Sequence, residues 1–537
     1  MPSITFARKP RSNLKANPSP APAGWPLQFL LYAVFFAGLM ALHAPLLRLP
    51  YFWDEAGYYI PAARDLFLTG SLIPHSTPSN AHPPLVMAWL AVAWRVFGYS
   101  TLVTRTAIVA LSAFSLLGLF RLARVAANPS VAAATVALVA LYPVYFTQSS
   151  LAQVDLPTAG FTFWALAAYL EDRSVSLVLW FSLALLAKET ALVAPLALCG
   201  WEVLATVMRP RWQTTKWKEI LPPAARKMRW FHFLLPVVPL AGWFAYHYWK
   251  MGFVLGNPEF FRYNVAATLN PLRIPFAFAM RLWQLFGYFA LYLLTLAGLL
   301  AMLRPARSDQ GAPRPRIPFW MQAALACVTI AYLIFMSAVG GAVLARYMLP
   351  VVPLLVLALV STLWRRAPYW GLIVAAVAIA FVAGLFTNPP YGFSLEDNLA
   401  YRDYIVMHAE ASRFLALQYP NARILTAWPA SDELTRPWLS YVSRPFHVIR
   451  VEDFSSPQID LAAKVRGHFD VALVFSTKYQ PDHPLFGNWQ AWQQIKEKFF
   501  GYHRDLSPED IAHQLGGTIV YSKSVNGQWI AVIQELR

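Results

Sequence analysis

The chain has 537 residues, of which 57% are apolar and 15% aromatic, whereas only 13% carry a charge. This exceeds the apolar content that the core of a water-soluble domain requires, so the composition indicates an integral membrane protein. The net charge of +17 is high enough for a nucleic-acid-binding protein, but the basic residues lie mainly in short segments between apolar runs. That distribution is typical of cytoplasmic loops, and we expect no nucleic acid partner.

Three basic segments mark the cytoplasmic side, namely the N-terminal arm (1–26), residues 209–229 and residues 304–316. The N-terminus is therefore expected inside, and the first apolar run is interpreted as a retained helix rather than a signal peptide. The two cysteines, Cys199 and Cys327, lie in apolar stretches without paired spacing. They predict neither a disulfide framework nor a thiolate metal site.

Apolar runs that match the thickness of a bilayer recur between residues 27 and 387 and predict a polytopic α-helical bundle of about 11–13 transmembrane helices. The twelve runs lie near 27–47, 84–99, 101–120, 131–146, 157–170, 175–187, 190–206, 231–249, 283–303, 318–338, 347–363 and 370–387. Twelve crossings would return the C-terminal part to the cytoplasm, whereas alternation from the basic linkers places it outside. One run is therefore broken, re-entrant or missed, and we expect the error within 84–206.

Residues 388–537 are a mixed polar chain, which predicts a soluble α/β domain on the periplasmic side. The pattern indicates a helix near 397–417 and strands near 423–426, 446–449, 470–475, 518–522 and 528–533. The last two strands flank Asn526-Gly527, a strong hairpin signal because both residues tolerate a positive φ. No glycine-rich phosphate loop follows these strands in the sequence, so they carry no nucleotide-binding signature.

The outer loop 48–82 is rich in ionisable residues, which are costly near lipid and point to function. Asp54 and Glu55 follow the first apolar run, and an amphipathic surface helix is predicted over 62–68. The acids have a structural alternative, because the dipole at the start of that helix favours them. His82 also has a structural alternative, because it could simply mark the start of a helix ahead of two prolines.

The spacing of the histidines and acids in this loop matches no compact zinc motif. We therefore expect no required metal or other cofactor, with a divalent metal as the alternative.

Further motifs follow in a fixed order along residues 54–350. They are Asp54-Glu55, Leu68-Thr-Gly70, His82-Pro-Pro-Leu85, Phe97-Gly98, Thr104-Arg105, Asp155-Leu-Pro157, Leu186-Ala-Lys-Glu189 and Arg346-Tyr-Met-Leu-Pro350. This series resembles the GT-C glycosyltransferases, in the branch of the dolichyl-phosphate-mannose protein mannosyltransferases and bacterial aminoarabinose transferases (glycosyltransferase families 39 and 83).

The resemblance implies a membrane enzyme that transfers a sugar from a polyprenyl-phosphate donor, usually with inversion, on the outer face of a bacterial inner membrane. The acceptor would be a protein, a glycolipid or another glycan. Asp54 would be the general base, and Glu55 would orient it or bind the acceptor. The donor phosphate would be bound by His82, Lys188, Arg346 and Arg105. Tyr58, Tyr59 and Asp155 would line the site.

Several of these residues also have structural explanations. For Arg105, we favour a structural role over phosphate binding, as a residue at the membrane boundary whose side chain snorkels to the lipid headgroups. Lys188 is expected either in an ion pair with Glu189 or at the phosphate. Asp155 could cap the helix that starts at Pro157, and Arg346 could be an interfacial anchor.

Two other classes of function remain as alternatives. A transporter or lipid flippase is also polytopic, but the matched repeats and broken helices typical of transporters are not evident in the sequence. A non-catalytic scaffold with a periplasmic binding domain would leave Asp54-Glu55 and His82-Pro-Pro unexplained. The sequence identifies neither the sugar nor the acceptor.

Overall fold

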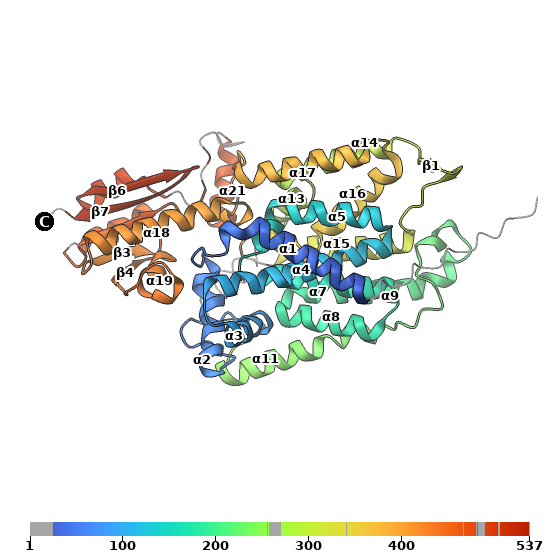
Figure 1. Cartoon of the computed structure of the whole chain (residues 1–537), viewed down its shortest axis with the longest axis horizontal. Helices are drawn as coiled ribbons and strands as arrows, with labels where there is room; N and C mark the ends of the chain where they lie inside the picture. The colour runs from blue at the N-terminus through green and yellow to red at the C-terminus, as the bar shows by residue number, and fades with distance from the viewer. Residues whose placement is uncertain are drawn as a thin grey trace, which may run out of the picture.

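The computed structural model describes residues 25–254, 256, 270–339, 341–465, 467–479, 481, 489–502 and 505–535. A bundle of apolar helices carries a sheet domain at one end (Figure 1). We call this the domain end, which carries residues 388–535. The opposite end, called the basic end, carries residues 213–229 and the short hairpin β1 (Ser308–Asp309) and β2 (Ala312–Pro313).

The long helices of the bundle are rich in leucine, alanine, valine and phenylalanine, and several expose apolar side chains as membrane helices do. The helices that run between the two ends are α1 (Trp25–His43), α4 (Thr101–Ala126), α5 (Pro129–Leu141), α7 (Asp155–Leu170), α8 (Ser174–Ala187), α9 (Val193–Trp212), α11 (Val237–Met251), α14 (Leu291–Met302), α15 (Phe319–Ala338), α16 (Val352–Arg366) and α17 (Trp370–Phe386). By length and composition alone, 5 described stretches can cross a membrane, and shorter apolar helices such as α5, α8 and α17 accompany them. The chain is a polytopic helical membrane protein.

Helix α3 (Leu85–Phe97) does not run between the two ends, which corrects the predicted crossing at 84–99. The loop before it contacts the C-terminal domain, where Arg436 donates to the Ser76 carbonyl at 3.0 Å. The residue after it does so too, because the Tyr99 hydroxyl donates to the Trp438 carbonyl at 2.8 Å. Both ends of α3 therefore lie at the domain end. Without this run, an odd number of the predicted crossings remains. An odd number places the N-terminus and the C-terminal domain on opposite sides, as alternation from the basic linkers predicts.

The apolar stretch Arg273–Met302 is two helices, α13 (Arg273–Phe286) and α14, separated by a break at which Phe289 and Ala290 have φ of 45° and 63°. Arg273 donates to the Phe499 carbonyl at 3.2 Å, so α13 begins at the domain end. It also ends there, since Tyr288 contacts the segment before α18. The sequence prediction of one span at 283–303 included α14 and missed most of α13.

The centre of the bundle is the contact between α4 and α7, because every residue of α7 is buried. Two glycines allow this close packing. A Cβ on Gly160 would lie 2.7 Å from the Ser115 Cβ, and a Cβ on Gly118 would lie 2.6 Å from the Trp164 ring. The close approach holds α7 rigidly, and with it Asp155 at the first position of the helix.

The C-terminal domain has a five-stranded sheet with the order β4-β3-β5-β7-β6. Strand β3 is parallel to β4 and β5, and β7 is antiparallel to β5 and β6. The elements are α18 (Ala400–Gln418), β3 (Arg423–Ala427), α19 (Ala430–Thr435), β4 (His447–Val451), α20 (Ser456–Lys464), β5 (Val471–Phe475), α21 (Gln490–Phe500), α22 (Pro508–Leu515), β6 (Gly517–Val525) and β7 (Gln528–Glu535). The predicted helix, strands and hairpin are confirmed, with Asn526 and Gly527 at φ of 50° and 77°.

The first outer loop packs between the bundle and the C-terminal domain (Figure 1). It contains a π-helical turn (Glu55–Tyr59) followed by α2 (Ile60–Thr69). The Tyr441 hydroxyl of the C-terminal domain donates to the Tyr51 carbonyl at 3.0 Å. A Cβ on Gly57 would lie 2.7 Å from the Trp428 ring, so the two parts touch closely beside Asp54.

Candidate active site

Asp54 and Glu55 occupy different environments although they are adjacent. Asp54 precedes the π-helical turn, a rare backbone form that is frequent at functional sites, and its side chain is 22% exposed. The Glu55 side chain is 0% exposed. Only the first carboxylate is therefore open to an external molecule.

Arg346 joins three carboxylates that are far apart in the sequence. It lies in the short turn Ala345–Met348 between α15 and α16. Its Nη2 donates to Asp54 at 2.5 Å, its Nε lies 3.2 Å from Asp155, and its Nη1 pairs with Glu396. The side chains of Arg346, Asp155 and Glu396 are only 3–4% exposed. We call Asp54, Asp155, Arg346 and Glu396 the Arg346 cluster.

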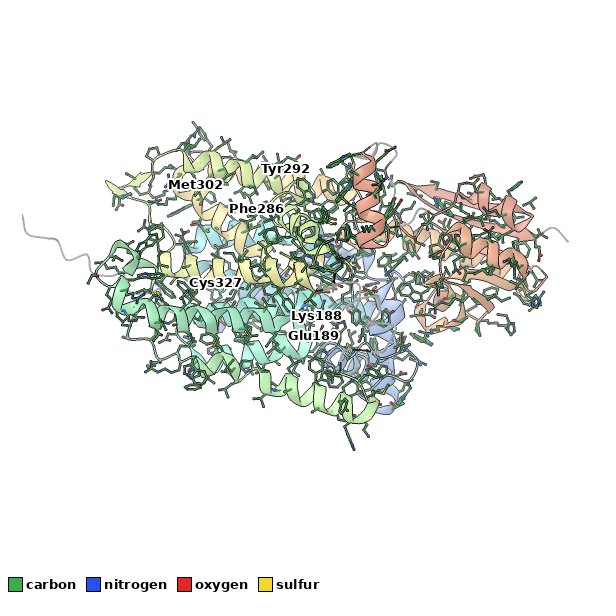
Figure 2. The ribbon with its side chains drawn as sticks, turned by 180° about the vertical axis from the view of Figure 1, so that it is seen from behind. Lys188, Glu189, Phe286, Tyr292, Met302 and Cys327 are labelled. Carbon is green, nitrogen blue, oxygen red and sulfur yellow. The ribbon has the colours of Figure 1, made fainter. Side chains whose placement is uncertain are left out.

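Lys188 extends this cluster. Its Nζ donates to Asp155 at 2.6 Å and lies 4.0 Å from the centre of the Tyr347 ring. Its ion pair is thus with Asp155 rather than with Glu189, which pairs with His82 Nδ1 at 2.9 Å. Figure 2 shows Lys188 and Glu189 next to each other in the half of the bundle nearer the C-terminal domain. The predicted capping role of Asp155 is not what the structure shows, because Asp155 is the first residue of α7 and its carboxylate contacts Lys188 and Arg346.

Glu55 and Arg105 form a separate, buried pair behind Asp54. Arg105 Nη1 donates to Glu55 Oε1 at 2.5 Å, and the backbone amides of Phe52 and Ala152 donate to the same carboxylate. Arg105 also donates to the carbonyl of Ser150. Arg105 is 1% exposed, so it does not snorkel to the headgroups as expected. The structure brings neither residue into the Arg346 cluster, and both side chains bind groups of the protein itself.

The other predicted residues lie around the cluster. The ring of Tyr59 is stacked on His82 with 6.1 Å between the ring centres. Tyr58 is half-buried, with its ring 6.1 Å from that of Trp428. His82 also borders a hollow at the surface that is lined by residues of the first outer loop, by Met87 of α3 and by Trp243 of α11.

Sequence reasoning missed two acids that enter this region from the C-terminal side, Glu396 and Asp397. Glu396 Oε2 accepts a hydrogen bond from Gln153 at 2.8 Å, and Asp397 Oδ2 accepts one from Tyr288 at 2.6 Å. Burial, and next the charge of Glu396, raise the pKa of Asp397 to about 7. The only signal in the sequence is that Glu396 and Asp397 are adjacent acids shortly after the last apolar run. That pattern does not predict which basic residue they contact.

Arg281 of α13 is a second omission. It is fully buried and donates to Gln284 Oε1 at 2.8 Å and to the Leu344 carbonyl at 2.7 Å. Within the described part of the chain, no carboxylate forms an ion pair with it. Its guanidinium lies 5.7 Å from the Tyr347 ring centre, which Lys188 also contacts. The region therefore contains a buried cation whose charge the described acids do not directly pair.

No metal centre emerges from the geometry of the described residues. Within those ranges, no three or more His, Cys, Asp or Glu side chains are grouped so that they could hold a metal ion. Independence of metal therefore stays a prediction from the sequence.

Comparison with known proteins gives one family-model match and a set of similar folds. A family model described as dolichyl-phosphate-mannose-protein mannosyltransferase matches residues 81–222. The crystal structure of ArnT from Cupriavidus metallidurans bound to undecaprenyl phosphate has a TM-score of 0.52 and 14% identity, over 94% of this chain and 97% of that chain. The chain therefore has the fold of the GT-C glycosyltransferases. The family match over residues 81–222 agrees with the branch of the protein mannosyltransferases that the order of the motifs predicts.

More distant GT-C structures are similar over much of the chain. Archaeoglobus fulgidus AglB in complex with an inhibitory peptide and a dolichol-phosphate is 11% identical with a TM-score of 0.43, over 94% of this chain and 74% of AglB. The mycobacterial arabinofuranosyltransferase AftD is 12% identical with a TM-score of 0.42, over 95% of this chain and 40% of AftD. These scores are too low to carry an argument about the GT-C site. No curated protein sequence matches the chain.

Proposed function

We propose that this GT-C glycosyltransferase transfers a sugar from a polyprenyl-phosphate donor to an acceptor hydroxyl at the domain end, with Asp54 as general base. The observation that carries the proposal is the contrast in exposure within the Arg346 cluster. Asp54 is 22% exposed, whereas the other carboxylates are 3–4% exposed. A general base must come within hydrogen-bond reach of the proton it accepts, and Asp54 is the acid of this cluster that an acceptor can approach.

The reaction is a single displacement with inversion. The acceptor oxygen attacks the anomeric carbon while the bond from that carbon to the donor phosphate oxygen breaks. The acceptor proton passes to Asp54, and the bond electrons leave with the phosphate on the lipid. The developing charge on the phosphate needs cations in a dry environment, where electrostatic interactions are strong. Lys188 and Arg346 are buried cations beside the base, which suits that role.

The lipid carrier and the orientation are part of the proposal. The ArnT structure was obtained with undecaprenyl phosphate, and its fold covers nearly this whole chain. The basic end has the charge expected of a cytoplasmic face, so the domain end and the site would face the periplasm of a bacterial inner membrane. The acceptor would be a protein, a glycolipid or a glycan at that face, and no metal would be required.

The experiment that tests the proposal uses purified protein in lipid with a panel of polyprenyl-phosphate sugars and, in parallel, nucleotide sugars. We expect a new glycosidic product from a lipid-linked donor only, at a rate that a chelator leaves unchanged. Movement of the lipid across the bilayer without product would favour the flippase alternative. Failure of folded protein to use or move any donor would favour the scaffold.

A further inference from the structure

The segment that leads into the C-terminal domain reaches the Arg346 cluster. It follows α17 and contains the short turn Leu395–Asp397, whose three residues are all buried. We propose that Glu396 in this turn is a positioning residue, which holds Arg346 in the orientation that meets Asp54. The C-terminal part of the chain would then complete the active site rather than only cover it. This inference rests on the proposed function of Asp54 as the base.

Glu396 is itself held firmly by the bundle. Its Oε1 pairs with Arg346 Nη1, and Ser394 donates to the same oxygen at 3.2 Å. Its Oε2 accepts from Gln153 at 2.8 Å, and its main-chain carbonyl accepts from Thr147 of α6 (Pro143–Gln148) at 2.6 Å. Both carboxylate oxygens and the backbone are thus bound, so the carboxylate has a fixed position.

Because Glu396 has a fixed position, the guanidinium of Arg346 that binds it is also fixed relative to Asp54. The fork of an arginine is planar and rigid, so an anchor on one Nη also sets the direction of the other. Arg346 Nη1 meets Glu396 and Nη2 meets Asp54 at 2.5 Å. Glu396 is 3% exposed and has no open face for a substrate, which makes it a support for Arg346 and not a second base.

Glu396 also sets the charge balance around the base. The charged groups that face it are Arg346 from the turn before α16, Asp54 from the first outer loop, Asp155 from α7 and Asp397 from its own turn. Removal of the Glu396 charge leaves more of the positive charge of Arg346 to act on the remaining acids. Their charged forms are then favoured, so proton uptake during turnover becomes less favourable.

The test compares Glu396→Gln, Glu396→Asp and wild type in the full-length protein in lipid, with transfer of labelled sugar from a polyprenyl-phosphate donor measured against pH. In Glu396→Gln, we expect kcat to fall by about tenfold or more, since charge-assisted bonds contribute about twice what neutral ones do. We also expect the acidic limb of the pH–rate profile to move to lower pH. Glu396→Asp keeps the charge but withdraws it from Arg346, so kcat falls and the limb stays in place.

Glu433→Gln is the matched control. Glu433 is as buried as Glu396 but pairs with His408 within the C-terminal domain at 2.6 Å. This variant can lose thermal stability, but its pH–rate profile should equal that of the wild type. The comparison separates a general weakening of the domain from an effect on the base.

Each outcome decides between the claims. Folded Glu396→Gln with the kcat and pH profile of the wild type would overturn the positioning role and leave the proposed function intact. A loss of active protein, with the acidic limb of the pH–rate profile unchanged, would assign Glu396 to stability alone. That result would also overturn the positioning role. If Glu396→Gln does not fold, unchanged kcat in Glu396→Asp would contradict the role. A wild type that transfers from no donor would instead refute the proposed function.

Discussion

At the scale of single residues, the two adjacent acids of the first outer loop have different tasks. In the sequence, Asp54 and Glu55 look equivalent, because position along the chain does not show which side chain faces solvent. The π-helical turn that begins at Glu55 directs this carboxylate to Arg105 and to two backbone amides. Asp54 remains at the edge of the buried region, with Arg346 as its partner.

This difference predicts that Glu55→Gln damages stability. The change leaves Arg105 buried without its countercharge, which costs about 3–5 kcal/mol when one member of a buried pair is removed. Thermal unfolding in detergent should show a large loss relative to wild type. The control is Asp309→Asn, which neutralises an exposed acid paired with Arg314 at the basic end. A Glu55→Gln variant as stable as this control would contradict the structural role of Glu55.

At the scale of elements, the sequence predicts the type of each element better than its direction in the membrane. Strands β3 to β7 follow from short apolar segments, and the final hairpin follows from Asn526-Gly527. Apolar content reveals that α3 is in or on the membrane but not how its axis runs. Its placement follows instead from contacts on both sides of it, where Ser76 and Tyr99 meet the C-terminal domain.

The position of α3 predicts the side from which its flanking residues can be labelled. In a variant without Cys199 and Cys327, single cysteines are introduced at His75 before α3, at Ser100 after it, and at Ser130 near the start of α5. All three positions are exposed. A membrane-impermeant thiol reagent should modify the first two from the same side and the third from the other. Labelling of positions 75 and 100 from opposite sides would show that α3 crosses.

At the scale of the whole molecule, the site depends on contacts that no local pattern encodes. Arg346, Asp155 and Glu396 come from three segments, and only the packing of α7, the turn before α16 and the turn before α18 brings them together. The resemblance to a family identified Asp54, Asp155, Lys188 and Arg346 because they lie in its motifs. It did not identify Glu396, which lies outside the motifs that carry the resemblance.

The buried Asp397 predicts how the stability of the molecule depends on pH. Burial raises the pKa of Asp397 in the folded protein to about 7, whereas an unfolded aspartate titrates near 3.9. The folded state therefore binds the proton more tightly, and the contribution of this group is lost as the pH rises through about 7. Asp397→Asn removes the titration. Its stability relative to wild type should increase between pH 4 and 7, by at most roughly 4 kcal/mol.

Thermal unfolding of both proteins across this pH range measures the effect. Asp309→Asn is again a suitable control, because Asp309 is exposed at the basic end and its difference from wild type should not depend on pH in the same way. A difference between Asp397→Asn and wild type that stays constant from pH 4 to 8 would show that Asp397 is not held protonated.

The measurement that tests the central claim most directly is sugar transfer from a polyprenyl-phosphate donor by the purified protein in lipid, with Asp54→Asn compared with wild type and Asp309→Asn. The change at Asp54 removes basicity at nearly constant volume. We predict transfer by wild type and Asp309→Asn, and a fall of about 10²–10⁴-fold in Asp54→Asn with its fold intact, because this is the usual contribution of a general base. Full turnover by folded Asp54→Asn would contradict its role as the base.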